Sequence, residues 1–187
     1  MKLLGKNILF LGSSVTYGSA AGGVSFVEIM AEKCGYSYIK EAVSGTTLAD
    51  INEKSYVSRL KKLGTDFKAD LFVCQLSTND ASRAIPLTEV EDAIRFIVEY
   101  TRINFVCPIV FYTNPYYDSE NYMKMVDLVN KLSKELGFYV LDLYNDAKMR
   151  ELPEELYKQY MADRIHPTYK GYKEWLTPEF IKFFDRI

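Results

Sequence analysis

The chain contains a single histidine, His166, which follows Asp163 by three residues and directly precedes Pro167. An imidazole ring titrates close to neutral pH, so it can accept and return a proton during a reaction. A nearby carboxylate can orient the ring and stabilise its protonated form. The spacing therefore predicts an acid–base pair. Asp142, at the end of an apolar run, is a second candidate for the acid, but it lies far from His166 in sequence.

A serine that this pair could activate lies near the start of the chain. Ser14 follows the apolar run 8–11 and belongs to the segment Gly-Ser-Ser-Val-Thr at residues 12–16. A serine hydroxyl is a weak nucleophile at neutral pH and needs a neighbouring base. We expect Ser14 to attack a carbonyl carbon while His166 takes its proton and Asp163 holds the ring. The alternative is that Ser14 only caps a helix and that His166 is structural.

Attack on a carbonyl group requires fixed donors for the negative charge that develops on its oxygen. The N–H of Ser14 is one candidate, since the dipole of a following helix favours negative charge. Gly45 is a second, because a residue without Cβ lets the backbone approach closely. The side-chain amide of Asn79 is the third. The alternative for Gly45 and Asn79 is a plain turn. Asp80 is expected to brace its loop.

The order of elements predicts how these residues come together. Five short apolar runs are candidate strands, at residues 7–11, 38–42, 71–76, 109–113 and 139–143. Helical spacing of apolar residues lies between them, clearest at residues 90–98, 125–136 and 172–184, while residues 55–68 fit one helix and a loop. Such alternation predicts an α/β fold, a three-layer α/β/α sandwich around a five-stranded parallel sheet of flavodoxin-like type. In such folds, ligands bind beyond the carboxyl ends of the strands. The segments that carry Ser14, Gly45, Asn79 and the pair Asp163 and His166 can all meet there.

Composition narrows the class of protein. The length of 187 residues fits one domain, residues 1–187. With 23 basic and 25 acidic residues, the net charge of −2 predicts no nucleic-acid partner. No apolar run approaches a membrane span, so we expect no membrane partner. No secretory signal opens the chain, so we expect a cytoplasmic protein.

The cysteines and the single histidine argue against a metal site. Cys34, Cys74 and Cys107 are odd in number and lack metal-ligand spacing, so we expect buried free thiols in a reducing compartment. One histidine with scattered carboxylates makes a poor metal site.

The motifs resemble those of GDSL-type hydrolases of the SGNH superfamily, whose conserved blocks are named for Ser, Gly, Asn and His. The matching segments are residues 12–16, 43–47, 77–80 and 163–167, in family order over nearly the whole chain. The resemblance implies the SGNH hydrolase fold, no cofactor, Ser14 as nucleophile, Gly45 and Asn79 in an oxyanion hole, and Asp163 with His166 as acid and base.

Two positions depart from the family pattern. Ser13 replaces the Asp that usually precedes the nucleophile, and Ser77 replaces the Gly that usually opens the third block. Neither position supplies a catalytic atom in the family scheme. The departures bear on local hydrogen bonding and loop shape, and hence on substrate preference.

Several tyrosines lie close in sequence to the predicted site. Tyr17 follows the nucleophile, while Tyr116 and Tyr117 follow the fourth strand. One interpretation is packing and loop anchoring. The other is a partly exposed aromatic wall that contacts a sugar or an acyl group of the substrate.

We predict a serine esterase or acylhydrolase that cleaves small carboxylic esters through an acyl-enzyme on Ser14, for example acetyl esters of carbohydrates. The chain is short for a deep lipid tunnel, although lysophospholipase or thioesterase activity on longer acyl chains is an alternative. From another class, the chain would be a non-catalytic small-molecule binding module on the same fold. A nucleotide- or flavin-binding domain is a further alternative, but the usual Gly-rich phosphate loops are missing.

Overall fold

The computed structural model describes all residues from Met1 to Ile187 and is built around one five-stranded sheet, in the order β2-β1-β3-β4-β5. Every neighbouring pair of strands is parallel. The strands are β1 (Asn7–Gly12), β2 (Ser37–Ala42), β3 (Leu71–Gln75), β4 (Ile109–Tyr112) and β5 (Tyr139–Leu141). The predicted set of five parallel strands is confirmed, although β3, β4 and β5 end one or two residues earlier than predicted.

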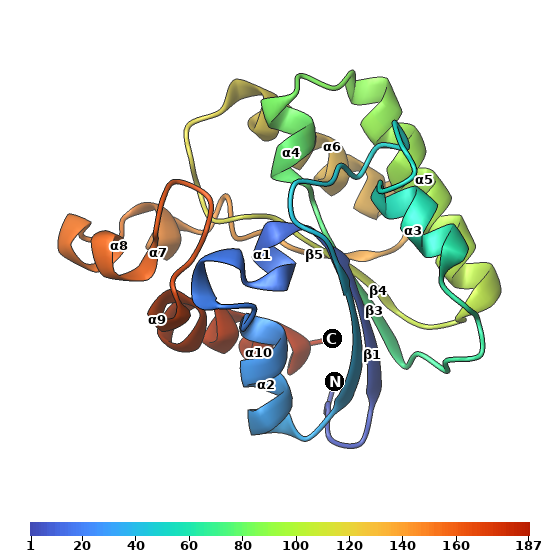
Figure 1. Cartoon of the computed structure of the whole chain (residues 1–187), viewed down its shortest axis with the longest axis horizontal. Coiled ribbons are helices and arrows are strands. Elements are labelled where there is room, and N and C mark those ends of the chain that lie inside the picture. The colour runs from blue at the N-terminus through green and yellow to red at the C-terminus, as the bar shows by residue number, and fades with distance from the viewer.

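Helices connect successive strands and cover both faces of the sheet (Figure 1). They are α1 (Ser14–Tyr17), α2 (Phe26–Cys34), α3 (Tyr56–Lys62), α4 (Thr78–Ser82), α5 (Leu87–Asn104), α6 (Glu120–Leu136), α7 (Ala147–Arg150), α8 (Glu154–Tyr160), α9 (Tyr169–Gly171) and α10 (Thr177–Phe184). A short 3₁₀ segment, Ser19–Ala21, follows α1, and a π-helical segment, Tyr172–Leu176, precedes α10.

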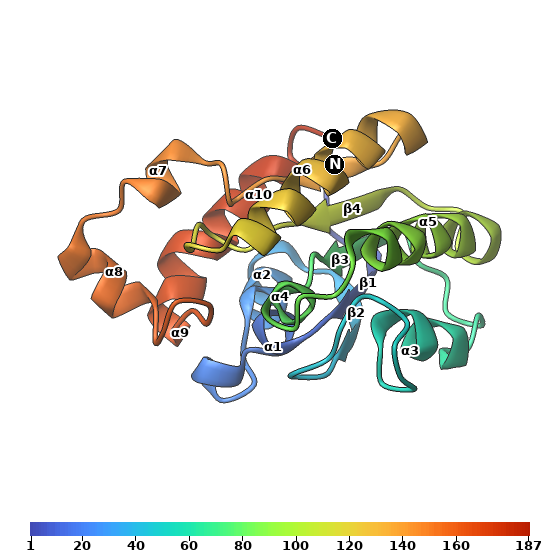
Figure 2. The same ribbon diagram turned by 90° about the horizontal axis from the view of Figure 1, so that it is seen from above.

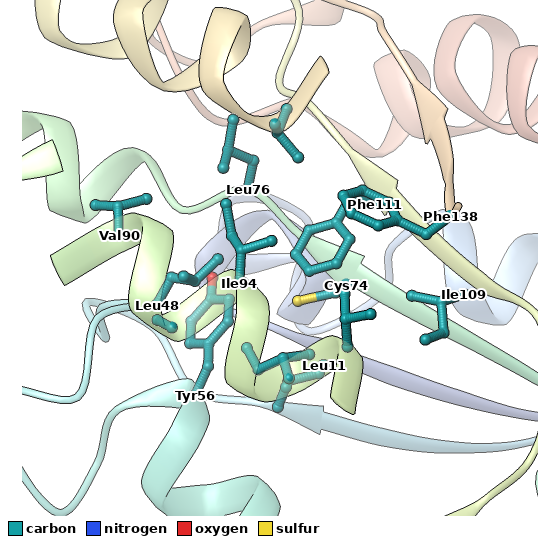
Figure 3. Packing of buried hydrophobic residues seen from close by; sticks show 14 of the residues in the cluster. Leu11, Leu48, Tyr56, Cys74, Leu76, Val90, Ile94, Ile109, Phe111 and Phe138 are labelled. Atoms are coloured by element: carbon teal, nitrogen blue, oxygen red, sulfur yellow. The ribbon is translucent and has the colours of Figure 1, made fainter. Parts of the chain in front are cut away.

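One face of the sheet packs against α3, α5 and α6. Leu11, Cys74 and Phe111 are aligned across β1, β3 and β4, so their side chains leave the same face. Figure 3 shows them beside Tyr56 of α3 and Ile94 of α5. Neighbouring residues of a strand point to opposite faces of the sheet. The residues next to Leu11, Cys74 and Phe111 in their strands therefore face the other helical layer.

The opposite face packs against α2, the π-helical segment and α10. Phe10 and Tyr112 leave the sheet on this side and meet Phe26, whose ring stacks on that of Phe180 with centroids 3.9 Å apart. Strands buried on both faces read as nearly continuous apolar runs, as β3 does. The predicted three-layer sandwich is therefore confirmed.

The predicted last helix is interrupted by the π-helical segment. The N–H of Thr177 donates to the carbonyl oxygen of Tyr172, five residues earlier. Pro178 comes next and has no N–H to continue the α-helical ladder. Wider π turns commonly accommodate such a break.

The three cysteines are free, but only Cys74 is buried, while Cys34 and Cys107 are half-buried. The expectation of buried thiols is therefore met only for the strand cysteine. Among the helices, none combines the length and the apolar character that spanning a membrane would require.

The chain reverses its direction of winding between β1 and β3, which are neighbours although β2 lies between them in sequence. Loops that follow the carboxyl ends of such strands diverge and leave room for a ligand. Here α1 follows β1, the segment 43–55 follows β2 and α4 follows β3. These are the segments that carry Ser14, Gly45 and Asn79.

Candidate active site

Ser14, His166 and Asp163 form a connected row of hydrogen bonds. The Nε2 atom of His166 lies 2.8 Å from Oγ of Ser14, and Nδ1 lies 2.8 Å from Oδ2 of Asp163. Ser14 begins α1, whereas the other two residues lie in the loop between α8 and α9. This is the geometry in which a base can take the proton of a nucleophile while a carboxylate holds the base.

The turn around Asp163 fixes the direction of its carboxylate. Oδ1 accepts hydrogen bonds from the N–H groups of Ile165 and His166 at 2.7 and 2.8 Å, which leaves Oδ2 for the imidazole. Partial burial works to raise the pKa of Asp163, but the hydrogen bonds from His166 and Ile165 outweigh it and lower that pKa. The group is therefore a carboxylate at neutral pH.

Asp142, the alternative acid, makes its contacts elsewhere. Its carboxylate accepts hydrogen bonds from the amide of Asn130, the amide and N–H of Asn145 and the hydroxyl of Thr113. These contacts anchor the end of β5. The geometry therefore favours Asp163 over Asp142 as the partner of His166.

The turn that presents Ser14 is compact. A Cβ added to Gly12 would lie 1.8 Å from Oγ1 of Thr16, so only glycine fits there. The N–H of Ser14 has no acceptor within the chain, because Ser14 is the first residue of a helix. Since α1 has only four residues, stabilisation of an anion would come from this free N–H rather than from a long helix dipole.

Gly45 lies in the loop after β2 with a φ of +77°, a conformation that side chains with Cβ rarely adopt. A Cβ added there would meet nothing within 4 Å. The backbone conformation therefore favours glycine here, and the open space leaves its N–H accessible to a bound oxygen atom. Its N–H has no acceptor within the chain, which leaves a second free donor.

The amide of Asn79 is held by the same loop. Its Nδ2 donates to the carbonyl oxygen of Thr46 at 2.9 Å, and one N–H of this amide stays available. Ser77, which stands where the family has glycine, caps α4 by accepting a hydrogen bond from the N–H of Asn79 at 3.2 Å. Thr46 thus ties Asn79 to the loop that contains Gly45, while Ser14 follows β1, the strand that lies between β2 and β3.

A buried relay of two amides connects the nucleophile turn to the histidine loop. Oε1 of Gln75 accepts hydrogen bonds from the N–H of Ser13 at 3.0 Å and from the hydroxyl of Thr16 at 2.9 Å. Its Nε2 donates to Oδ1 of Asn114 at 3.4 Å, and the amide of Asn114 donates to the carbonyl oxygen of Ile165 at 3.1 Å. Gln75, Asn114 and Ser13 are all buried, so Ser13 serves this relay where the family has aspartate.

Two charged residues hold the loop that contains Gly45. The carboxylate of Asp80 accepts hydrogen bonds from the N–H groups of Leu48 and Ala49 at 2.8 and 2.9 Å, as its predicted bracing role requires. Burial raises the pKa of Asp80, and these hydrogen bonds partly offset the rise. Arg59 is also buried and donates to the carbonyl oxygen of Gly12 at 2.8 Å and to Oγ1 of Thr46 at 3.2 Å.

The sequence analysis did not identify Gln75, Asn114 or Arg59. A signal existed for Gln75, which is the one polar residue in the otherwise apolar run 71–76. A buried amide of this kind must find hydrogen-bond partners. Nothing comparable marks Arg59, since it lies on a helix among other charged residues.

The three tyrosines proposed to contact substrate differ in their surroundings. Tyr17 and Tyr116 are exposed, and Arg150 lies 4.3 Å from the ring centroid of Tyr116. Tyr117 is half-buried, its ring centroid lies 4.9 Å from that of Tyr122, and its hydroxyl is enclosed without a partner. This placement favours a packing role for Tyr117, whereas the side chains of Tyr17 and Tyr116 are exposed and can contact a ligand.

The structure contains no group of three or more His, Cys, Asp or Glu side chains that could hold a metal ion. The chemistry that the site itself can perform is nucleophilic. It combines a serine hydroxyl, a base in contact with it, an acid behind the base and free N–H donors on adjoining loops.

Comparison with known proteins places this geometry in a family. The sequence pattern of the GDSL-like Lipase/Acylhydrolase family matches residues 10–174, most of the chain. No protein of curated function matches the sequence significantly.

Several solved structures share the fold at low sequence identity. A protein from Lactobacillus plantarum superposes with a TM-score of 0.82 at 19% identity, covering 98% of each chain. A member of the lipolytic protein G-D-S-L family from Veillonella parvula gives 0.78 at 14% identity, covering 97% of this chain and 99% of that one. The psychrotrophic esterase EstA from Pseudoalteromonas, solved with a monoethylphosphonate inhibitor, gives 0.71 at 19% identity, covering 97% of each chain.

Proposed function

Since the chain belongs to the GDSL-like lipase/acylhydrolase family, we propose that it is a serine esterase that hydrolyses small carboxylic esters with Ser14 as its nucleophile. The observation that carries the proposal is the contact of 2.8 Å between Oγ of Ser14 and Nε2 of His166, backed by Asp163. The substrate partner is a small-molecule ester, and no cofactor takes part in the proposed reaction.

In the first half of the reaction, Oγ of Ser14 attacks the ester carbonyl carbon and its proton passes to Nε2 of His166. The carboxylate of Asp163 stabilises the imidazolium that forms. The carbonyl oxygen becomes an anion and accepts hydrogen bonds from the N–H groups of Ser14 and Gly45 and from the amide of Asn79. Donors of this kind typically contribute about 3–4 kcal/mol each to transition-state stabilisation.

The imidazolium then gives its proton to the leaving alcohol oxygen as the ester bond breaks, and the acyl group stays on Ser14. Water attacks this acyl-enzyme with His166 again acting as base, which releases the acid and restores the serine.

We propose short acyl groups, of which acetyl esters of carbohydrates are one example. The residues from Met1 to Ile187 form the sheet and the helices that cover it (Figure 2), and the proposed acyl site lies on the loops at one edge of that sheet. Exposed Tyr17 and Tyr116 offer flat surfaces to such a substrate. Changing both to alanine should raise KM for the preferred ester, and unchanged kinetics would remove them from the substrate site.

A chain-length series of 4-nitrophenyl esters, from acetyl to palmitoyl, tests the proposed function. We expect the highest kcat/KM at acetyl to butyryl, and no turnover by the Ser14→Ala variant. A maximum at long acyl chains would favour a lysophospholipase or a thioesterase instead.

The competing class is a non-catalytic binding module on the same fold. It predicts a folded protein that hydrolyses none of these esters. For a nucleotide- or flavin-binding domain, the purified protein would release a chromophore or a nucleotide on denaturation, whereas we expect neither.

A further inference from the structure

A pocket of about 350 Å³ adjoins the oxyanion loop. It is lined by residues 43–46, by residues 52–54 and by Arg83. The lining includes Gly45, whose free N–H is one of the proposed donors. Gly45 is the one lining residue that the proposed reaction uses, so a substrate group would have to extend past Gly45 to enter the pocket.

The pocket carries a net positive charge, since its lining has two basic side chains, Lys54 and Arg83, and one carboxylate, Glu53. Of its charged side chains, Glu53 pairs with Lys62, which lies 3.8 Å away, whereas Lys54 and Arg83 form no salt bridge. Nη2 of Arg83 donates to the carbonyl oxygen of Gly45 at 2.8 Å, which holds the guanidinium against the loop and leaves its other donors free. Two unpaired cations at one pocket, in a chain with a net charge of −2, favour an anionic ligand.

Two hydrogen bonds hold the backbone of Lys54 in place. Nε of the buried Arg59 donates to the carbonyl oxygen of Lys54 at 3.0 Å, and the N–H of Lys54 donates to Oδ1 of Asn52 at 2.9 Å. With the bond between Arg83 and Gly45, these contacts hold the residues that carry both cations, so less entropy is lost on binding.

The position of the pocket indicates which part of an ester it would hold. His166 must reach the leaving oxygen to protonate it, so the alcohol departs on the side of the α8–α9 loop. In both views the segment between β2 and α3 lies on the opposite side of α1 from α8 and α9 (Figures 1 and 2). The side of the pocket is therefore the side left for the acyl group.

We propose that Arg83 and Lys54 bind a carboxylate at the far end of the acyl group, so that the enzyme prefers half-esters of short dicarboxylic acids. This inference rests on the proposed esterase function and narrows it, with neutral acyl esters as slower substrates. Planar guanidinium groups suit carboxylates because two parallel hydrogen bonds can form.

The test compares esters that differ only in charge. Ethanol release is measured from monoethyl succinate and monoethyl glutarate, against the neutral isosteres ethyl 4-methylpentanoate and ethyl 5-methylhexanoate, in which an isopropyl group replaces the carboxylate. O-acetylglycolate, compared with isobutyl acetate by acetate release, places the carboxylate on the alcohol instead. Each pair gives a ratio of kcat/KM values, for wild type, Arg83→Gln, Lys54→Gln and the control Lys33→Gln on the far helix α2.

We expect wild type to favour at least one half-ester over its isostere about tenfold, as one charge-assisted hydrogen bond would provide. Arg83→Gln and Lys54→Gln should each lower that ratio several-fold, Lys33→Gln should keep it, and added salt should reduce it. Neutral esters cleaved as fast as half-esters, or a preference only for O-acetylglycolate, would overturn the inference and leave the esterase function standing. No hydrolysis of any ester would overturn both.

Discussion

The side-chain amide of Asn114 donates a hydrogen bond to the carbonyl oxygen of Ile165 across 3.1 Å, and so ties the end of β4 to the loop that carries His166. Through Gln75 the same relay reaches the turn that carries Ser14. Nucleophile and base come from opposite ends of the chain, and this buried connection sets their separation.

Replacing Asn114 by alanine should therefore lower kcat more than it raises KM, because the histidine loop loses its anchor. A misplacement of about 1 Å can reduce a rate about a hundredfold. The control is Asn104→Ala, which removes another amide–carbonyl hydrogen bond, to Tyr100, at the end of α5 that leads into the amino end of β4. Equal kinetics for the two variants would show that the relay does not position His166.

Gln75→Met should destabilise the fold, since the N–H groups of Ser13 and Thr16 lose their buried acceptor. An unsatisfied buried donor typically costs about 1–3 kcal/mol, so we expect the free energy of unfolding in urea to fall by at least about 2 kcal/mol. The exposed Gln159→Met should change it by less than about 0.5 kcal/mol. A similarly small change for Gln75→Met would contradict the relay.

These two amides mark what sequence patterns can and cannot predict here. The strands and the amphipathic α5 and α6 follow from local periodicity and are confirmed. The four motifs predicted the family through their resemblance to it, and the family is confirmed as well. The partnership of Gln75 with Asn114 depends on which strands become neighbours, and Arg59 reaches Gly12 only after α3 packs beside the sheet. Contacts of that kind exist only in the folded chain.

The backbone conformation of Gly45 is a second feature that could not be predicted from the sequence. The sequence predicts that the absence of Cβ lets the N–H of Gly45 approach a substrate oxygen, and the structure adds that its backbone is left-handed, at φ +77°. Gly45→Ala should lower kcat, because left-handed backbone costs an alanine about 1–2 kcal/mol. Gly45→Asn should retain more activity, since asparagine tolerates this conformation. Equal losses for both variants would mean that a substrate atom needs the space instead.

Asp163→Asn should reduce kcat strongly, by a factor on the order of 10⁴ as for other triad acids. It should also change the pH dependence of stability. The folded pKa of Asp163 is lowered, so its stabilising contribution is present above the ordinary carboxyl pKa of about 4 and is lost as pH falls through the folded value. Wild type should thus be the more stable protein at pH 7, with a smaller difference in acid, as measured by urea unfolding. A difference that grows in acid would contradict this sign.

The most direct test of the central claim is intact-mass analysis after treatment with a fluorophosphonate, applied to wild type, Ser14→Ala and His166→Ala. We expect one adduct on wild type, none on Ser14→Ala and much slower labelling of His166→Ala, because the reagent reports a serine activated by its base. A folded wild-type protein that takes up no adduct, or an adduct that persists in Ser14→Ala, would contradict the assignment of Ser14 as the nucleophile.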